Sequence, residues 1–238
     1  EKLIINERYE AWGSLARKLA HEIKNPLTPI QLTIDRIKDK YIKQMTNEDR
    51  DSFKENLKII NTQIKQIENL VNQFSDFARM PKPIFKKNEL VKILNENIKL
   101  LAEIDKSIEI KVVKNKDHIF FECDKEQIAR VFFNLIKNSI ESIEQKAEKN
   151  LNFKKKILIE ILSNNDHIKF TLIDNGIGFD EKYNINEILN PYYTTKKNGT
   201  GLGLSIVNKI INDHKGELEF TPMQDGAKIE IKFKLDGS

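Results

Sequence analysis

The chain has 238 residues, of which 39% are hydrophobic and 32% are charged, and its net charge is +4. This length allows one large domain or two ordinary ones. Acidic and basic residues are mixed along the whole chain without a basic tail, so the sequence predicts no nucleic-acid binding and no contact with a membrane surface. The lone Cys123 excludes an internal disulfide and indicates a reducing compartment.

No run of about 18 apolar residues is present, so the sequence predicts no membrane span within this chain. It also has no secretory signal pattern. The first residues lack a methionine and already follow a helical pattern. We therefore expect a fragment of a longer protein, located in the cytoplasm.

Two long amphipathic helices are predicted within residues 1–80. Apolar residues of the first recur in alternating steps of four and three, at positions 16, 20, 23, 27, 30, 34, 37 and 41. The second repeats the rule at positions 53, 57, 60, 64, 67, 71, 74 and 78. This is the spacing of a heptad seam, and the polar turn at 46–49 between the helices has N-cap chemistry. Because a two-helix hairpin cannot cover both sides of such seams, the sequence predicts a homodimer built as a four-helix bundle.

The first predicted helix carries a reactive-looking histidine. His21 is followed directly by Glu22 and, one helical turn later, by Asn25 on the same face. No serine or cysteine nucleophile and no second metal ligand stands at a suitable spacing, which points to the imidazole itself as the reactive group. Pro26 and Pro29 remove helix hydrogen bonds just after it, which either allows bending or fixes a kink.

The prolines of Met80-Pro81-Lys82-Pro83 end the hairpin and stiffen the connection that follows. Beyond them, helical patterns cover 89–102, 125–149 and 201–214. Strand patterns cover 108–113, 119–122, 156–162, 168–173, 217–220 and 227–233. Because the strands cluster late and pair locally, an α+β sandwich is expected, and not a doubly wound parallel sheet. The predicted organisation is a hairpin at 1–80, a linker at 81–87 and a second domain at 88–238.

Three polar motifs lie in the second domain. Asp174 ends an apolar strand and is followed by Gly176 and Gly178, so its carboxylate can accept a hydrogen bond from an exocyclic amine such as that of adenine; a plain hairpin turn is the alternative. Asn134 and Asn138 share one helix face, and amide oxygens suit Mg²⁺; a pair of helix-surface amides is the alternative, which the pair in isolation favours.

The third motif is glycine-rich and opens a helix, with glycines at positions 199, 201 and 203. Glycines at a helix N-terminus expose unpaired N–H groups to an anion, and the helix dipole has the matching sign. No Lys-Ser/Thr pair follows the last glycine, so the segment is not a P-loop, and no strand leads directly into it as in a dinucleotide-binding fingerprint.

In this order and on these elements, the three motifs resemble the ATP-binding domain of sensor histidine kinases, an α/β sandwich of the Hsp90-like type shared with MutL- and gyrase-type ATPases. With segment 21–30 the resemblance covers essentially the whole chain. Segments 21–30 and 77–83 look most like the NtrY type of nitrogen-regulation kinase. The resemblance implies ATP and Mg²⁺ as cofactors, a response-regulator receiver domain as partner, and a full-length protein anchored in the bacterial inner membrane.

The resemblance also implies a role for each matching residue. Asp174 would bind the adenine amine, and Gly176 and Gly178 would shape its pocket. Asn138 would bind Mg²⁺, with Asn134 supporting the phosphates.

The remaining implied roles belong to the lid and to the acceptor helix. Gly199, Gly201 and Gly203 would border the phosphates and hinge a lid spanning residues 180–198. Thr195 and Lys196 lie in that lid, and Lys196 is the predicted γ-phosphate contact. His21 would accept the phosphoryl group with Glu22 as general base, and Asn25 would orient water for a phosphatase reaction on the partner.

Residue 134 separates the competing functions. Hydrolysing relatives place a glutamate four residues before the Mg²⁺-binding asparagine, whereas this chain has Asn134, and an amide cannot take a proton from water. The sequence therefore favours a protein-histidine kinase that phosphorylates His21 and then a response-regulator aspartate. An ATP-gated clamp and a non-catalytic dimerisation scaffold are the alternatives.

Overall fold

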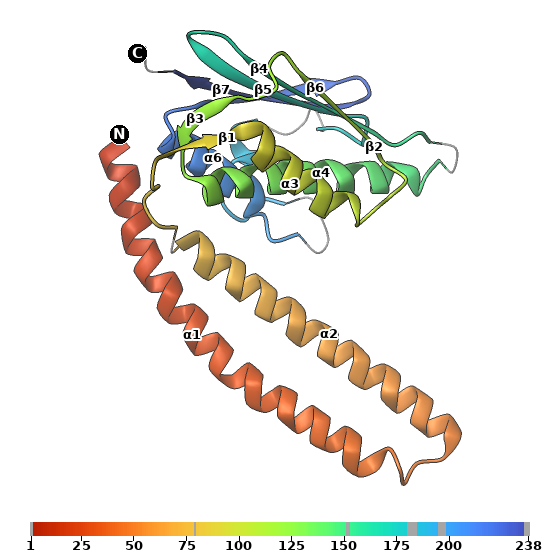
Figure 1. Ribbon diagram of the computed structural model, residues 1–238. Coiled ribbons are helices and arrows are strands. Elements are labelled where there is room, and N and C mark those ends of the chain that lie inside the picture. The colour runs from red at the N-terminus through yellow and green to blue at the C-terminus, as the bar shows by residue number, and fades with distance from the viewer. Residues whose placement is uncertain (1, 79, 151–152, 180–184, 195–198, 236–238) are drawn as a thin grey trace. The chain divides into compact units, whose positions relative to one another are not determined.

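The computed structural model describes residues 2–78, 80–150, 153–179, 185–194 and 199–235. The chain divides into two compact units, Glu1–Pro81 and Lys82–Ser238. The first is a helical hairpin and the second is a sheet covered by helices, as Figure 1 shows. No helix among the described residues is both long and apolar enough to cross a membrane.

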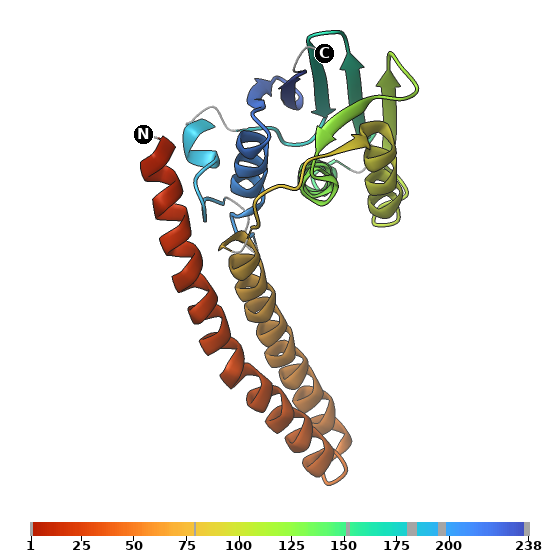
Figure 2. The same ribbon diagram turned by 60° about the vertical axis from the view of Figure 1, so that its left-hand side comes forward.

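The hairpin consists of α1 (Lys2–Tyr41) and α2 (Asn47–Ala78), which run antiparallel to each other (Figures 1 and 2). Thr46 caps α2, because its Oγ1 accepts a 3.3 Å hydrogen bond from the backbone N–H of Asp49. Between the helices, Gln31 Nε2 donates a 2.8 Å hydrogen bond to Asn61 Oδ1. Helix α1 continues through both of its prolines, and Figure 1 shows it curved along its length.

Alternate members of the two predicted seams are buried within the hairpin. The buried members are Ala20, Leu27, Ile34, Leu57, Ile64 and Val71. The members between them are exposed by 37–46%, namely Ile23, Ile30, Ile37, Ile60 and Ile67. The side chains at positions 16 and 78 lie outside the described part of the chain. The hairpin thus buries every second residue of each seam. The residues between them form an apolar row on its surface.

The second unit is built on a five-stranded sheet in the order β2-β4-β5-β7-β6. These strands are β2 (Glu109–Lys114), β4 (Lys156–Ser163), β5 (His167–Asp174), β7 (Gly226–Lys234) and β6 (Glu217–Met223). Strand β2 pairs parallel to β4, and every other pairing in this sheet is antiparallel. The mixed, mostly antiparallel sheet confirms the predicted α+β class.

Helices α3 (Leu90–Ala102), α4 (Lys125–Ala147) and α6 (Gly203–Asp213) cover one face of this sheet (Figures 1 and 2). The core lies between them, where Phe132 of α4 and Phe170 of β5 pack with ring centroids 4.9 Å apart and are almost fully buried. Helix α6 begins two residues later than predicted, because Gly201 has a φ of +67°, which lies outside the right-handed helical region.

Two short elements were absent from the sequence prediction. Strand β1 (Lys86–Glu89) pairs antiparallel with β3 (Phe120–Cys123), and the single-turn helix α5 (Ile185–Ile188) lies in the segment predicted as a lid. Strand β1 carries no apolar residue, so no alternating pattern marks it. It forms because β3 supplies backbone partners and because Asn88 Nδ2 donates a 2.8 Å hydrogen bond to Cys123 O.

Candidate functional site

Asp174 is a buried carboxylate at the end of β5, with 3% of its surface exposed. Its Oδ2 accepts a 2.9 Å hydrogen bond from Ser139 Oγ, and its Oδ1 accepts one of 2.9 Å from the backbone N–H of Gly176. Burial raises the pKa of Asp174, while these hydrogen bonds and the nearby charge of Lys146 act in the opposite direction. A carboxylate held in this way keeps lone pairs free to accept a further donor.

The glycines after Asp174 are required by close packing. A Cβ at Gly176 would stand 2.2 Å from Ser142 Oγ of α4. Gly178 has a φ of +73°, and a Cβ there would stand 2.5 Å from the carbonyl oxygen of Gly226. The Ile177 N–H also donates a 3.0 Å hydrogen bond to Ser142 Oγ. The loop that carries Asp174 is therefore held between α4 and the β6–β7 turn.

The structure brings the paired amides and the glycine-rich segment together. A Cβ at Gly203, the first residue of α6, would stand 3.4 Å from Asn134 Oδ1 and 3.9 Å from Asn138 Nδ2. Asn134 is oriented by a 2.8 Å hydrogen bond from its Nδ2 to Arg130 O. The N-terminus of α6, whose first N–H groups have no partner within the helix, thus lies against two amides, an arrangement suited to an anion accompanied by a hard cation.

The other glycines of this segment flank the same helix start. Gly201 O accepts a 3.0 Å hydrogen bond from Tyr192 N, and a Cβ at Gly201 would stand 2.4 Å from the Tyr192 carbonyl carbon. Gly199 is half-buried at the beginning of the described segment. The predicted lid residues Thr195 and Lys196 lie outside the described residues.

Among the described residues, no three His, Cys, Asp or Glu side chains are grouped to hold a metal ion. Mg²⁺ binds amide oxygens together with water and phosphate oxygens, so the residue types at Asn134 and Asn138 fit it.

In the first unit, the side chains of His21, Glu22 and Asn25 are all exposed on α1. Ala20, directly before the histidine, is 3% exposed and belongs to the buried half of the seam. The helix therefore turns the imidazole to solvent at the edge of its apolar row. This placement leaves a ring nitrogen accessible to an incoming electrophile.

Three side chains of α4 that hold the Asp174 loop were missed in the sequence analysis: Ser139, Ser142 and Lys146. They follow Asn138 at intervals of one, four and eight residues, so they continue the helix face or its border toward the C-terminus. The recurrence of polar residues along this side of an amphipathic helix was a usable signal, but nothing in it indicated what these side chains contact.

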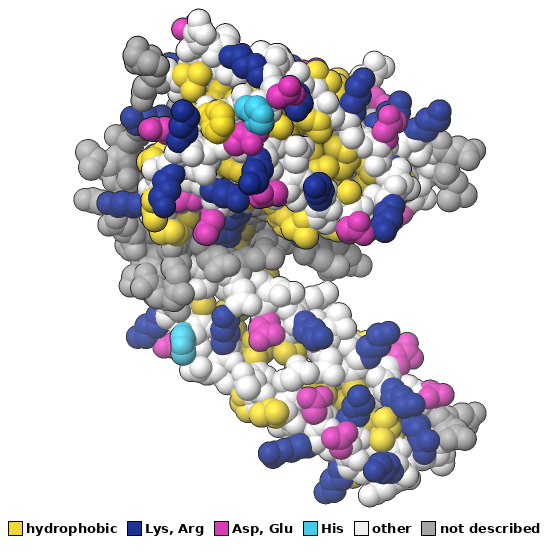
Figure 3. Space-filling view, in the orientation of Figure 1, with side chains coloured by type: hydrophobic (Ala, Val, Ile, Leu, Met, Phe, Trp, Pro, Cys, Tyr) yellow, Lys and Arg dark blue, Asp and Glu magenta, His cyan; other side chains and the backbone are white. Residues whose placement is uncertain are grey.

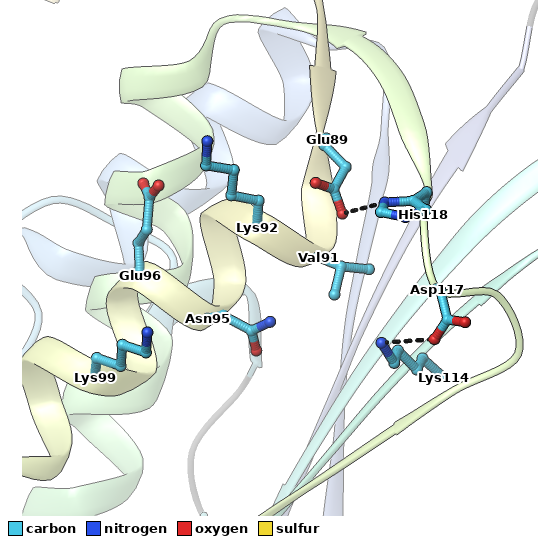
Figure 4. Close-up of a pocket in the computed structure, with 9 residues that line it drawn as sticks. All are labelled: Glu89, Val91, Lys92, Asn95, Glu96, Lys99, Lys114, Asp117 and His118. Carbon is cyan, nitrogen blue, oxygen red and sulfur yellow. Dashed lines mark ion pairs between the residues drawn. The ribbon is translucent and has the colours of Figure 1, made fainter.

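The second unit also has a hollow of about 380 Å³ beside α3 and the β2–β3 connection. Figure 4 shows its wall, where Glu89 pairs with His118 at 3.5 Å and Lys114 pairs with Asp117 at 3.0 Å. None of the predicted site residues lines it. Figure 3 shows acidic and basic side chains interleaved over the visible face, so no single sign of charge would select a ligand there.

The chain matches two family models in succession. Residues 11–83 match the His Kinase A (phospho-acceptor) domain, and residues 123–237 match the histidine kinase-, DNA gyrase B- and HSP90-like ATPases. The chain belongs to the histidine kinases, with a phospho-acceptor hairpin followed by an ATP-binding domain.

Within that family the chain is similar to NtrY-like sensor kinases. It is 38% identical over 234 residues to a putative sensor histidine kinase NtrY-like of Rickettsia felis, covering 98% of this chain and 38% of that protein. It is 35% identical over 242 residues to nitrogen regulation protein NtrY of Azorhizobium caulinodans, covering 99% of this chain and 30% of that protein. The chain thus spans about a third of the length of these relatives.

Solved structures agree in fold. The catalytic domain of histidine kinase ThkA has a TM-score of 0.56 at 25% identity, covering 63% of this chain and 95% of that one. ThkA in complex with response regulator protein TrrA has a TM-score of 0.65 at 23% identity, covering 96% of this chain and 63% of that one. The second likeness concerns the fold alone.

Proposed function

We propose that this chain transfers the γ-phosphoryl group of ATP to His21 and then to an aspartate of a response-regulator receiver domain. The proposal rests on the close approach of Gly203 to Asn134 and Asn138, in the same unit as the buried carboxylate of Asp174. These groups offer a purine acceptor at one point and a phosphate-binding helix start at another. All of these residues lie within residues 123–237, the part of the chain that matches the histidine kinase-, DNA gyrase B- and HSP90-like ATPases.

In the proposed reaction, a ring nitrogen of His21 attacks the γ-phosphorus and the bond to the bridging oxygen breaks, so ADP leaves. Glu22, next to the histidine, takes the imidazole proton. Mg²⁺ near Asn138 would neutralise phosphate charge, and Lys196 is the proposed γ-phosphate contact, with Thr195 beside it. Such transfer depends on positioning and charge neutralisation more than on covalent assistance.

Asn134 supports phosphoryl transfer to protein over release of phosphate to water. Its Nδ2 donates to Arg130 O and its Oδ1 faces the start of α6, so the side chain offers no group able to deprotonate water. ATP held in this site would wait for another nucleophile. The exposed imidazole of His21 meets that requirement.

The hairpin is proposed to dimerise through its exposed row of isoleucines. Pairing two hairpins would bury the uncovered half of both seams in a four-helix bundle. We assign residues 1–80 to dimerisation and phospho-acceptance, 81–87 to a linker and 88–238 to ATP binding. The whole protein is proposed to be anchored in the bacterial inner membrane, with this part facing the cytoplasm.

A phosphatase activity toward the same receiver domain is a second proposed function. Asn25 is exposed one helical turn after His21, so its amide can reach a phosphoaspartate docked at the histidine. An amide there can orient an attacking water without competing as a nucleophile.

The kinase proposal is tested by incubating the chain with Mg²⁺ and γ-labelled ATP, then challenging the product with acid and with base. Label on the protein that is lost in acid, stable in base and absent from His21→Gln is the expected result. The matched control is His118→Gln, an exposed histidine of the other unit, which should label normally. Free phosphate without labelled protein would instead indicate an ATPase, and absence of nucleotide binding would indicate a scaffold.

A further inference from the structure

Lys146, in the last turn of α4, joins two neighbouring segments. Its Nζ donates hydrogen bonds of 2.9 Å to both Asn175 O and Gly176 O, the two carbonyls that follow Asp174. The same Nζ forms an ion pair with Asp225 in the β6–β7 turn. The lysine therefore ties both segments to one helix end.

These contacts act on the backbone that orients Asp174. The Gly176 N–H donates to Asp174 Oδ1, so any shift of Gly176 moves a hydrogen bond of the carboxylate itself. Ser139 donates a hydrogen bond to the other carboxylate oxygen, Oδ2 of Asp174. Lys146 donates to the backbone carbonyl oxygens of Asn175 and Gly176. The carboxylate is thus held from α4 at two places, by Ser139 directly and by Lys146 through the loop backbone.

The β6–β7 turn packs against the same loop. Gly226 has a φ of +101°, and a Cβ there would stand 1.9 Å from the carbonyl oxygen of Asp174. Asp225, directly before it, is paired to Lys146. The ion pair therefore holds the turn where its backbone limits the movement of Asp174.

We propose that Lys146 is a positioning residue for purine recognition, which sets the orientation of the Asp174 carboxylate toward the exocyclic amine of ATP. The inference rests on the proposed function and deepens it. A neutral side chain at position 146 would leave Asn175 O and Gly176 O without their cationic donor and would release the β6–β7 turn.

Electrostatics supports the same assignment. Burial raises the pKa of Asp174, and the charge of Lys146 is among the influences that lower it, after the hydrogen bonds from Gly176, Ser139 and Ala227. A lysine that both orients the loop and favours the ionised carboxylate strengthens an acceptor for an N–H donor.

The test compares the affinity of the whole chain for ATP and for ITP, whose purine carries a carbonyl in place of the exocyclic amine. Binding is measured by calorimetry with Mg²⁺ present. In Lys146→Met the preference for ATP should fall about tenfold, as expected for loss of one well-aligned hydrogen bond to a charged acceptor. Lys146→Arg, which keeps the charge and several N–H donors, should restore the preference to within about threefold of the unaltered chain.

A merely structural lysine would lower thermal stability while leaving the ATP-to-ITP preference unchanged, and that result would overturn the inference. Lys149→Met, an exposed lysine just beyond α4, is the matched control and should keep the preference. If Lys146→Met does not fold, Lys146→Gln decides by the same ratio. An unaltered chain that binds neither nucleotide would remove the proposed function as well, whereas loss confined to this ratio concerns Lys146 alone.

Discussion

The hydroxyl of Ser139 donates a 2.9 Å hydrogen bond to Oδ2 of Asp174, where the middle of α4 meets the end of β5. This bond and the one from Gly176 compensate part of the cost of burying a carboxylate. Compensation is incomplete, since burial still leaves the pKa of Asp174 above its ordinary value. Ionisation of the proposed adenine acceptor therefore lowers the stability of its own domain.

Asp174→Asn is expected to stabilise the nucleotide-free chain and to abolish ATP binding. A carboxyl whose pKa is raised on folding contributes stability that is present below about pH 4 and is lost as the pH rises through the raised value, so ionising Asp174 costs stability. Asparagine removes the charge and can still bond Gly176 and Ser139. Recovery of about 1 kcal/mol would raise the melting temperature by about 2–4 °C.

Differential scanning calorimetry with and without ATP and Mg²⁺ measures both effects. Asp166→Asn, at an exposed carboxyl of the β4–β5 connection, is the control and should keep its nucleotide-dependent increase in melting temperature. A melting temperature of Asp174→Asn that falls in the absence of ATP would contradict the expected cost of the buried charge.

Ile30→Glu is expected to convert the proposed dimer into a monomer. Ile30 is 46% exposed in the middle of the uncovered row, so a bundle would bury it, and a charge there would have no partner. The measurement is molar mass by light scattering during size-exclusion chromatography. Leu32→Glu is the matched control, because Leu32 is 55% exposed and lies about 200° around the helix from Ile30. Equal masses for the two variants would argue against this seam as the interface.

Asn25→Ala is expected to slow dephosphorylation of the cognate receiver domain at least about tenfold while His21 still becomes labelled. The alanine keeps the helix and removes the amide that would orient water. Loss of radioactive label from purified phosphorylated receiver, followed over time with ADP and Mg²⁺ present, measures the rate. An unchanged rate would remove the phosphatase proposal and leave the kinase proposal intact.

His214→Gln is expected to flatten the acid dependence of stability. Nε2 of the buried His214 accepts a 3.0 Å hydrogen bond from Asp124 N, so its Nδ1–H donates to Ile210 O at 2.8 Å. Burial lowers the pKa of His214, although its bond to Ile210 and the Asp124 and Asp213 charges oppose this shift. The unfolded chain therefore binds the proton more readily, and stability is full above about pH 6.5 and falls as pH drops toward the lowered value.

Urea unfolding of the unaltered chain and of His214→Gln at pH 7.5 and pH 5.5, followed by circular dichroism, measures how stability depends on pH. The decrease in the free energy of unfolding between pH 7.5 and pH 5.5 should be smaller in His214→Gln than in the unaltered chain. The substitution also removes the contact with the Phe85 ring, which affects stability at both pH values. Identical losses in the two chains would show that another group carries the acid sensitivity.

Much of the fold could be predicted because apolar residues recur along the sequence at the spacing of buried helix and strand faces. The steps of four and three through Leu27, Ile34, Leu57 and Ile64 mark a seam whose members do form the hairpin core. The pattern did not distinguish the members buried inside one hairpin from those left exposed, such as Ile30. That difference depends on how the two helices rotate about their axes, which one sequence does not specify.

The site was predictable where chemistry and backbone needs coincide in a short segment. Asp174 with Gly176, and the glycines before α6, combine a polar group with backbone freedom. In the structure Gly176 donates a hydrogen bond to Asp174, and Gly203 lies close to Asn134 and Asn138. Lys146 could not be found in this way. Its contacts lie 29, 30 and 79 residues further along the chain and include two backbone carbonyls, which leave no mark on sequence spacing.

The chain contains a single thiol, Cys123, and it is fully buried in β3, where burial raises its pKa to about 11. The thiolate is the form that reacts with thiol-directed reagents, so this buried cysteine should remain unmodified in the folded protein at neutral pH. A pair of new cysteines, for example Ser52→Cys on α2 and Lys99→Cys on α3, could then carry spin labels without removal of the native residue. Distances between such labels would measure the separation between the two units with and without nucleotide.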